Sequence, residues 1–306
     1  MSISNGLSNP DERGGARNSS KGKEFMRVKF WGTRGSIPVP GKDTTLYGGN
    51  TTCLEITLQG GRTVIIDAGT GIRPLGAKLA AENADVDIHL LITHIHWDHT
   101  LGFPFFSPIN SPSTKIIIDG HQNCIKGLRY TFDNKMGDGY FPITFDDLKA
   151  EITYLERLSN GVLEIDGTVI DSIPLQHPQG GFGFRFKEGD KTLVFITDNE
   201  LRDDPWEGRS PEEYAKFCKG ADILIHDSQY TPEEIHERHG WGHSDWQAAF
   251  EMAYEADVKK LILFHHDPPR TDPEVKAIEE LCEGLAKKRN SSMVIEAAKE
   301  NSEFEL

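Results

Sequence analysis

Short apolar runs separated by turn residues recur along most of this chain. Runs rich in Val, Ile, Leu and Phe, bounded by Gly, Pro, Asn or Asp, are typical of β-strands. The predicted strands are residues 28–31, 52–58, 63–67, 87–93, 115–119, 182–186, 192–197, 223–226 and 260–264. The pattern therefore indicates a protein with many short strands rather than a helical bundle.

Apolar residues at helical spacing lie between some of these strands. The predicted helices are residues 72–82, 211–217, 244–256 and 273–288. Ser244 and Asp272 are the predicted N-caps of the last two, and Pro273 stands at a first helical position. Strands alternating with helices, without a long linker or a repeat, predict one α/β domain over residues 26–306.

The first 25 residues are rich in Ser, Asn, Gly and charge, so residues 1–25 are predicted to be a disordered tail. They contain no apolar stretch of the kind a secretory signal needs, which favours a cytoplasmic location. No apolar run approaches the roughly 20 residues of a membrane span, so no membrane partner is expected. The scattered Cys53, Cys124, Cys218 and Cys282 are expected to be reduced, with Cys53 in the core.

Four side chains that can bind a metal follow the predicted strand 87–93. They are His94, His96, Asp98 and His99. The two histidines that lie two residues apart point to the same side if the extended backbone continues. Imidazole nitrogens and a carboxylate in one small volume favour a divalent metal site over a polar loop with chance histidines.

This H-x-H-x-D-H segment resembles the metallo-β-lactamase superfamily, and the resemblance continues along most of the chain. The turn with Asp67 and two following glycines looks like the family's first motif. His177, Asp198 and His265 each end an apolar run and look like the later motifs. Taken alone, each of the three would be interpreted as a strand-end residue whose side chain only makes local hydrogen bonds. Their order and their repeated placement after strands favour a role as metal ligands.

The resemblance implies a particular set of metal ligands. One divalent ion would be bound by His94, His96 and His177, the second by Asp98, His99 and His265, and Asp198 would bridge the two. The spacing leaves His266 open as a rival to His265. Nitrogen and oxygen donors without a thiolate make two zinc ions the expectation, although manganese and iron accept the same donors.

The same resemblance implies an αββα four-layer sandwich, in which two mixed β-sheets are flanked by helices and the metals lie at one edge. The chain departs from the H-x-E-x-D pattern of the flavodiiron branch, which argues against reduction of oxygen or nitric oxide.

A further pair of residues is similar to the ribonuclease Z branch. Asp227 ends an apolar run and His243 begins a predicted helix. By this resemblance Asp227 would hold His243, and His243 would stabilise the substrate phosphate or protonate the leaving oxygen. Asp98 is the third predicted catalytic residue, beside Asp227 and His243. Alternatively, His243 satisfies a helix end and Asp227 a turn.

The expected reaction is hydrolysis of a phosphodiester by a hydroxide that bridges the two ions.

The sequence has no long basic insertion of the kind with which ribonuclease Z grips tRNA. Residues 124–142 mix basic and aromatic side chains and are expected to form a loop, either one that covers a small substrate or one that is only solvated. A cyclic nucleotide or short oligonucleotide is the expected substrate, and class II cyclic-nucleotide phosphodiesterases share the motif.

Two other functions stay open at this point. The same metal centre could hydrolyse a lactone, a thioester or a β-lactam. A metal-stabilised binding module without turnover is a different class, but it would be expected to lack a ligand, and none is missing. A homodimer is the default assembly.

The charge of the chain refines the expected partner. The formal net charge is -15, from 48 acidic and 33 basic residues, which disfavours a broad grip on large nucleic acid. Residues 198–238 alone hold 12 acidic and 5 basic side chains, a net charge of -7. Because this window includes Asp198 and Asp227, bound cations would offset part of the excess and leave room for a small phosphodiester.

Overall fold

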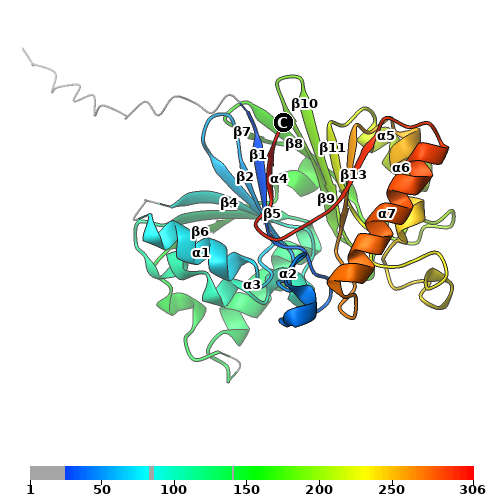
Figure 1. The fold of residues 1–306 in the computed structure, drawn as a ribbon. Helices are drawn as coiled ribbons and strands as arrows, with labels where there is room; N and C mark the ends of the chain where they lie inside the picture. The colour runs from blue at the N-terminus through cyan, green and yellow to red at the C-terminus, as the bar shows by residue number, and fades with distance from the viewer. Residues whose placement is uncertain (1–24, 83–85, 140) are drawn as a thin grey trace, which may run out of the picture.

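Two β-sheets lie face to face at the centre of the computed structural model, which describes residues 25–82, 86–139 and 141–306 (Figure 1). The first sheet has the strand order β14 (Glu303–Glu305), β1 (Arg27–Gly32), β2 (Cys53–Thr57), β3 (Thr63–Ile66), β4 (Asp87–Ile92), β5 (Lys115–Gly120) and β6 (Glu151–Tyr154). The second has the order β13 (Val294–Ala297), β12 (Lys260–Phe264), β11 (Ile223–Asp227), β10 (Lys191–Ile196), β9 (Phe182–Glu188), β8 (Thr168–Pro174) and β7 (Leu163–Ile165).

Helices cover the outer faces of both sheets (Figure 1). The first sheet carries α1 (Ile72–Ala81) and α3 (Gln122–Lys135), and the second carries α5 (Pro211–Cys218), α6 (Trp246–Glu255) and α7 (Asp272–Lys288). The short helices are α2 (Trp97–Thr100) and α4 (Arg157–Asn160), with 3-10 turns at Lys42–Thr44, Phe103–Phe105, Ser107–Asn110, Phe145–Asp147 and Ile235–Glu237. The predicted αββα sandwich of two mixed sheets is confirmed.

Both sheets have the same mixture of strand directions. In the first, β14, β1, β2 and β3 are paired antiparallel, and β3, β4, β5 and β6 are paired parallel. In the second, β7 to β10 are antiparallel and β10 to β13 are parallel. Since the carboxyl ends of parallel strands meet at one edge of a sheet, the loops after β3, β4, β10, β11 and β12 form the natural place for a site.

The sheets are held together by an apolar layer between them. Phe30 of β1 and Phe264 of β12 stack with ring centroids 5.8 Å apart, and Phe195 of β10 packs edge-on against Phe264. Separate buried clusters lie beneath α1 and beneath α5, α6 and α7. The strands therefore bury both faces, as expected when helices cover the outer side of each sheet.

The nine predicted strands and four predicted helices are all present, but both predicted N-caps are wrong. Asp245 caps α6, and Thr271 caps α7 in a capping box with Glu274. The Ser244 hydroxyl instead donates to the Asn199 carbonyl and accepts the backbone N–H of Leu201. The Asp272 carboxylate instead accepts backbone N–H groups from residues 46 and 47.

The predicted loop over residues 124–142 is also wrong for most of its length, because α3 continues to Lys135. Leu128 and Met136 are buried against the first sheet's outer layer, which explains why the segment is helical. Of the predicted tail, residues 1–24 lie outside the described part of the chain. Within the described part, no helix is long and apolar enough to cross a membrane. The single domain over residues 26–306 stays a prediction.

Candidate metal centre

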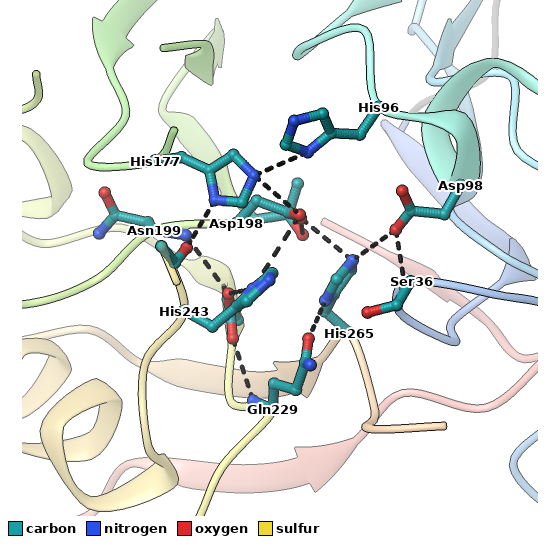
Figure 2. A network of polar contacts seen from close by, with 12 residues as sticks. Ser36, His96, Asp98, His177, Asp198, Asn199, Gln229, His243 and His265 are labelled. Atoms are coloured by element: carbon teal, nitrogen blue, oxygen red, sulfur yellow. Dashed lines mark hydrogen bonds and ion pairs between the residues drawn. The ribbon is translucent and has the colours of Figure 1, made fainter. Parts of the chain in front are cut away.

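Loops at one edge of the sandwich bring the seven predicted ligands together. The loop after β4 and the first turn of α2 supply His94, His96, Asp98 and His99. His177 follows β8, Asp198 follows β10 and His265 follows β12. Figure 2 shows Asp198 near the middle of this assembly, with His177 and His265 on either side of it. Residues that are 171 positions apart in the chain, His94 and His265, thus belong to one site.

One part of the site, which we term the histidine group, consists of His94, His96 and His177. Both His94 Nε2 and His177 Nε2 lie 3.0 Å from His96 Nδ1. His94 and His177 are buried, whereas His96 is half-buried. Three imidazole nitrogens therefore converge on one point that is accessible from one side.

The other part, the acidic group, consists of Asp98, His99, Asp198 and His265, all of them buried. His99 Nε2 lies 3.3 Å from both Asp98 Oδ2 and Asp198 Oδ1. His265 Nε2 lies 3.2 Å from Asp98 Oδ2 and 3.1 Å from Asp198 Oδ1. Two carboxylates and two imidazoles thus face one another without access from solvent.

Asp198 faces both groups, with one oxygen turned to each. Its Oδ2 lies 3.5 Å from His94 Nε2 and 3.7 Å from His177 Nε2. Its Oδ1 faces His99 and His265 at the distances given above. This is the arrangement that a ligand shared between two ions requires.

Oxygen atoms around the site fix which nitrogen of each imidazole carries the proton. Asp67 Oδ2 lies 2.7 Å from His99 Nδ1, and Gln229 Oε1 lies 2.9 Å from His265 Nδ1. The Gly242 carbonyl lies 2.8 Å from His177 Nδ1, and Gln179 Oε1 lies 2.8 Å from His96 Nε2. Each of these nitrogens donates, so in a neutral ring the other nitrogen faces the site with its lone pair.

The electrostatic environment differs between the two groups. Burial lowers the pKa of His94 well below its ordinary value and that of His177 to about 3, so both imidazoles are neutral. Burial would raise the pKa of Asp198, but His265 and His99 hold it well below the usual range. Burial opposes protonation of His99 too, yet the surrounding carboxylates raise its pKa.

These residues fit divalent ions. His96 Nδ1 and His177 Nε2 face each other at 3.0 Å, and the partners of both rings place the proton on the far nitrogen. Two lone pairs at this distance repel unless a cation lies between them. His99 Nε2 is likewise buried without a hydrogen bond. Neutral imidazoles and ionised carboxylates are the donor set of zinc and similar metals.

His243 and Asp227 form a hydrogen-bonded pair beside the acidic group. Asp227 Oδ2 accepts from His243 Nδ1 at 2.8 Å, and the His243 ring stacks on that of His265 with centroids 5.0 Å apart. Burial would lower the pKa of His243, but the charge and hydrogen bond of Asp227 raise it to about 9. Nε2 is the ring nitrogen left for a substrate.

The backbone is unusual at several of these positions. Ser36, Asp67, Gln179, Asp198 and His265 all have positive φ, between 58° and 66° except for 51° at Asp198. Such conformations are uncommon for residues other than glycine and persist where the surroundings determine them. At Ser36 the turn directs a backbone N–H to Asp98 Oδ2, 2.8 Å away.

The structure decides which of the neighbours His265 and His266 lies in the site. His265 points into the acidic group, whereas His266 Nε2 donates to the Ala298 carbonyl 2.9 Å away. Sequence reasoning did not single out Gln179 or Gln229, because a glutamine after a strand carries no signal of its own. Asp67 was noted only as part of the first motif, and its contact with His99 depends on the parallel pairing of β3 with β4.

A two-sheet sandwich with histidines and aspartates converging at one edge defines a metal-dependent hydrolase of the metallo-β-lactamase fold. The chain belongs to the beta-lactamase superfamily, since residues 62–266 match the family described as "Beta-lactamase superfamily domain". Ribonuclease Z of Thermoplasma acidophilum is 25% identical over 286 residues, which cover 82% of this chain and 89% of the relative.

Solved structures agree on the fold. The metallo-beta-lactamase fold protein YhfI from Bacillus subtilis has a TM-score of 0.69 at 17% identity, over 92% of this chain and 100% of that one. Unliganded yeast PDE1 has a TM-score of 0.65 at 15% identity, over 92% and 99% of the two chains. The predicted membership of the superfamily and its likeness to ribonuclease Z are confirmed.

Proposed function

We propose that this protein hydrolyses a small phosphodiester at two divalent ions, with His243 as the proton donor to the leaving oxygen. The observation that carries the proposal is the Asp227 and His243 pair. The imidazole Nδ1 lies 2.8 Å from Asp227 Oδ2 and 4.0 Å from Asp198 Oδ2, so the ring adjoins the candidate ligands and Asp227 leaves Nε2 as the nitrogen for a proton transfer.

In this proposal His94, His96 and His177 would hold one ion, Asp98, His99 and His265 would hold the other, and Asp198 would be shared. Ions bound there would lower the pKa of water toward neutrality and offset negative charge on the phosphate. Zinc is the proposed metal, because all seven donors are nitrogen or oxygen and no thiolate takes part, although manganese and iron accept the same donors.

The chain's own residues would orient the reactants. Asp227 holds the His243 ring through Nδ1 and favours its protonated form, so that Nε2–H can be given to the leaving oxygen. The Asp227 carboxylate is itself fixed by the backbone N–H of Gln229 at 3.0 Å and of Asn199 at 3.3 Å. Asp98 is oriented by the backbone N–H of Ser36 and would serve the reaction as a ligand that positions an ion.

The size of the substrate is the finer part of the proposal. The net charge of -15 favours a small phosphodiester over a polyanion that must be gripped across a wide surface. A relative that bears the name ribonuclease Z supports phosphodiester chemistry and makes RNA the principal competitor. The cytoplasmic location and the homodimer stay predictions.

The test is a substrate panel on metal-loaded protein. Bis-p-nitrophenyl phosphate, a cyclic nucleotide and a short oligoribonucleotide represent the small phosphodiesters, beside a structured RNA, a β-lactam, a lactone and a thioester. We expect turnover of the small phosphodiesters that His94→Ala abolishes and that His236→Ala, a change at an exposed histidine, retains.

Each other outcome overturns a defined part of the proposal. Inertness toward every phosphodiester would reject the reaction. Cleavage of the structured RNA alone would keep the reaction and reject the small substrate. Ester or lactam hydrolysis without phosphodiesterase activity would establish the alternative enzyme, and tight metal binding without any turnover would establish a binding module.

A further inference from the structure

Glu200 is a buried carboxylate to which the proposed reaction gives no part. It lies two residues after Asp198, at the end of β10, and only 2% of its surface is exposed. A carboxylate is costly to bury unless hydrogen-bond donors surround it. The donors around Glu200 therefore show which part of the molecule it holds in place.

Two backbone N–H groups of the loop before α6 donate to Glu200. Its Oε2 accepts from the N–H of Gly240 at 2.8 Å and from that of Gly242 at 3.0 Å. Its Oε1 lies 3.2 Å from Arg202 Nη1 and 3.4 Å from His239 Nδ1. The side chains of Arg202 and His239 are 24% and 55% exposed, so water can replace Glu200 as their partner. Gly242 is buried, and its N–H depends on Glu200.

The loop held in this way brings two functional positions next to each other in sequence. The Gly242 carbonyl lies 2.8 Å from His177 Nδ1, and the following residue is His243, the proposed proton donor. The rings of His177 and His243 have centroids 5.1 Å apart (Figure 2). A shift of the backbone at Gly242 would therefore displace the acceptor of a candidate metal ligand and the proposed donor together.

The loop fits closely against the strand end that supplies His177. Gly242 has φ of 83°, and a Cβ added to it would lie 2.1 Å from His177 Nδ1. Gly240 has a similar φ of 85°, but a Cβ added there meets no atom of the described part of the chain within 4 Å. The backbone N–H of Glu200 donates to the Gln176 carbonyl at 2.9 Å, so Glu200 is bonded to this strand end as well as to the loop.

We infer that Glu200 is a positioning residue that fixes His177 and His243 together, through the two backbone N–H groups of the loop over residues 239–243. The part that concerns His243 rests on the proposed function, in which this ring donates a proton to the leaving oxygen. A displaced donor slows the departure of a basic leaving group more than that of a weakly basic one, which departs without a proton. A displaced His177 weakens the binding of an ion at the histidine group.

The kinetic experiment uses Glu200→Leu and two esters that differ in the leaving group. Methyl phenyl phosphate releases phenolate, and methyl p-nitrophenyl phosphate releases the less basic p-nitrophenolate. With metal-loaded protein we expect kcat for the phenyl ester to fall about 10- to 100-fold, as a small misplacement of a reacting group produces. The fall for the p-nitrophenyl ester should be clearly smaller, and KM should change little for either ester.

Two further variants assign this effect to the hydrogen bonds. Glu200→Gln keeps an acceptor oxygen of the same reach and should recover most of the lost activity. Glu237→Leu is the matched control, because this exposed glutamate lies just before the same loop. It should leave kcat for both esters as in wild type.

Amide hydrogen exchange tests the inference without any turnover. In metal-loaded Glu200→Leu the N–H groups of Gly240 and Gly242 should exchange about tenfold faster, as loss of one hydrogen bond predicts, and the amides of β10 should exchange as in wild type. A chelator titration should show an ion bound about tenfold more weakly. Glu200→Gln and Glu237→Leu should match wild type in both measurements.

A second pair of variants tests the same coupling without a change at Glu200, in case Glu200→Leu does not fold. Gly242→Ala and Gly240→Ala impose the same backbone strain, but only the Cβ at Gly242 meets His177. Gly242→Ala should weaken metal binding about tenfold more than Gly240→Ala and should show the selective loss on the phenyl ester. Equal effects of the two variants would overturn the coupling.

The outcomes separate this inference from the proposed function. An equal loss on both esters, or faster exchange throughout the β-sheets of Glu200→Leu, would show a role in stability alone and overturn the inference. Wild-type turnover with unchanged exchange and kinetics in Glu200→Leu would overturn it too, while the proposed function stood. Faster loop exchange and weaker metal binding in a protein that hydrolyses no ester would reject the proposed function and retain the positioning of His177.

Discussion

The histidine group and the acidic group differ in exposure and in what surrounds them. The histidine group opens onto a pocket through half-buried His96, and Gln179, which fixes that ring, belongs to the pocket wall. The acidic group is closed, and its outer partners Asp67 and Gln229 are buried. One half of the site is therefore built to meet a substrate and the other to hold its geometry.

The comparison teaches that the surroundings of a candidate ligand matter as much as the type of ligand. When one partner of a buried hydrogen bond is removed, the group left behind stays desolvated without a partner, which costs free energy. At an exposed site, water can replace the missing partner. Changes around the acidic group should therefore act mainly on metal retention. Changes around the histidine group should act mainly on the substrate.

The largest effect is expected at Asp198, because it faces both groups. Asp198→Asn keeps the shape and tolerates φ of 51°, but it removes the charge that both groups share. We expect loss of both ions and a fall in kcat/KM of about 10³-fold or more, which corresponds to several kcal/mol of transition-state stabilisation. Elemental analysis and kinetics on the same sample measure both.

Asp257→Asn is the matched control, since this aspartate has φ of 52° in a turn after α6. It should retain both ions and full activity. If Asp198→Asn keeps one ion at wild-type affinity, the two groups do not share this ligand and the comparison fails.

The next largest effect is expected at His243. His243→Ala should lower kcat for a phosphodiester by about 10²- to 10⁴-fold, the usual contribution of a general acid, with both ions retained. The structure makes this a sharp test, because donor atoms of Asp198, Asp227, His243 and His265 also lie within 4.8 Å of one another. Loss of an ion in the variant would place His243 among the ligands of the acidic group.

The control for this change is His239→Ala, at an exposed histidine on the same loop. It should alter neither the metal content nor kcat by more than about twofold, as expected for a surface substitution.

A smaller effect is expected at Gln229, whose side-chain oxygen lies against His265 Nδ1. Gln229→Leu removes the acceptor at Nδ1 and should weaken metal binding by about 10- to 100-fold, as loss of an outer partner usually does. Gln229→Glu keeps an acceptor and should recover most of the affinity. A competition titration with a chelating dye measures the constants, and equal affinity in Gln229→Leu and wild type would show that the tautomer of His265 is fixed elsewhere.

The smallest effect is expected at Gln179, the corresponding residue of the histidine group. Since water can reach His96, Gln179→Leu should weaken metal binding by less than Gln229→Leu, about tenfold or below. The same titration compares the two variants directly. A larger loss at Gln179 than at Gln229 would reverse the distinction between an open group and a closed one.

Much of the fold could be predicted because its central strands are apolar runs with clear turn signals. Five strands were missed: β6, β7, β8, β13 and β14. Three of these, β6, β13 and β14, have only three or four residues and expose alternate ones, so none of them forms a continuous apolar run. The hairpin of β7 and β8 did carry a signal, since Asp166 and Gly167, both with positive φ, form its two-residue turn.

The sequence by itself supplied the seven candidate ligands and their order, through polar residues that end apolar runs and through the resemblance to the family that these residues carry. Only the tertiary structure decided between His265 and His266, through a positive φ that turns one inward and the Ala298 carbonyl that turns the other away. It also decided which nitrogen of each imidazole faces the site. Those choices depend on oxygen atoms from distant segments, and no local pattern in the chain records where such segments will pack.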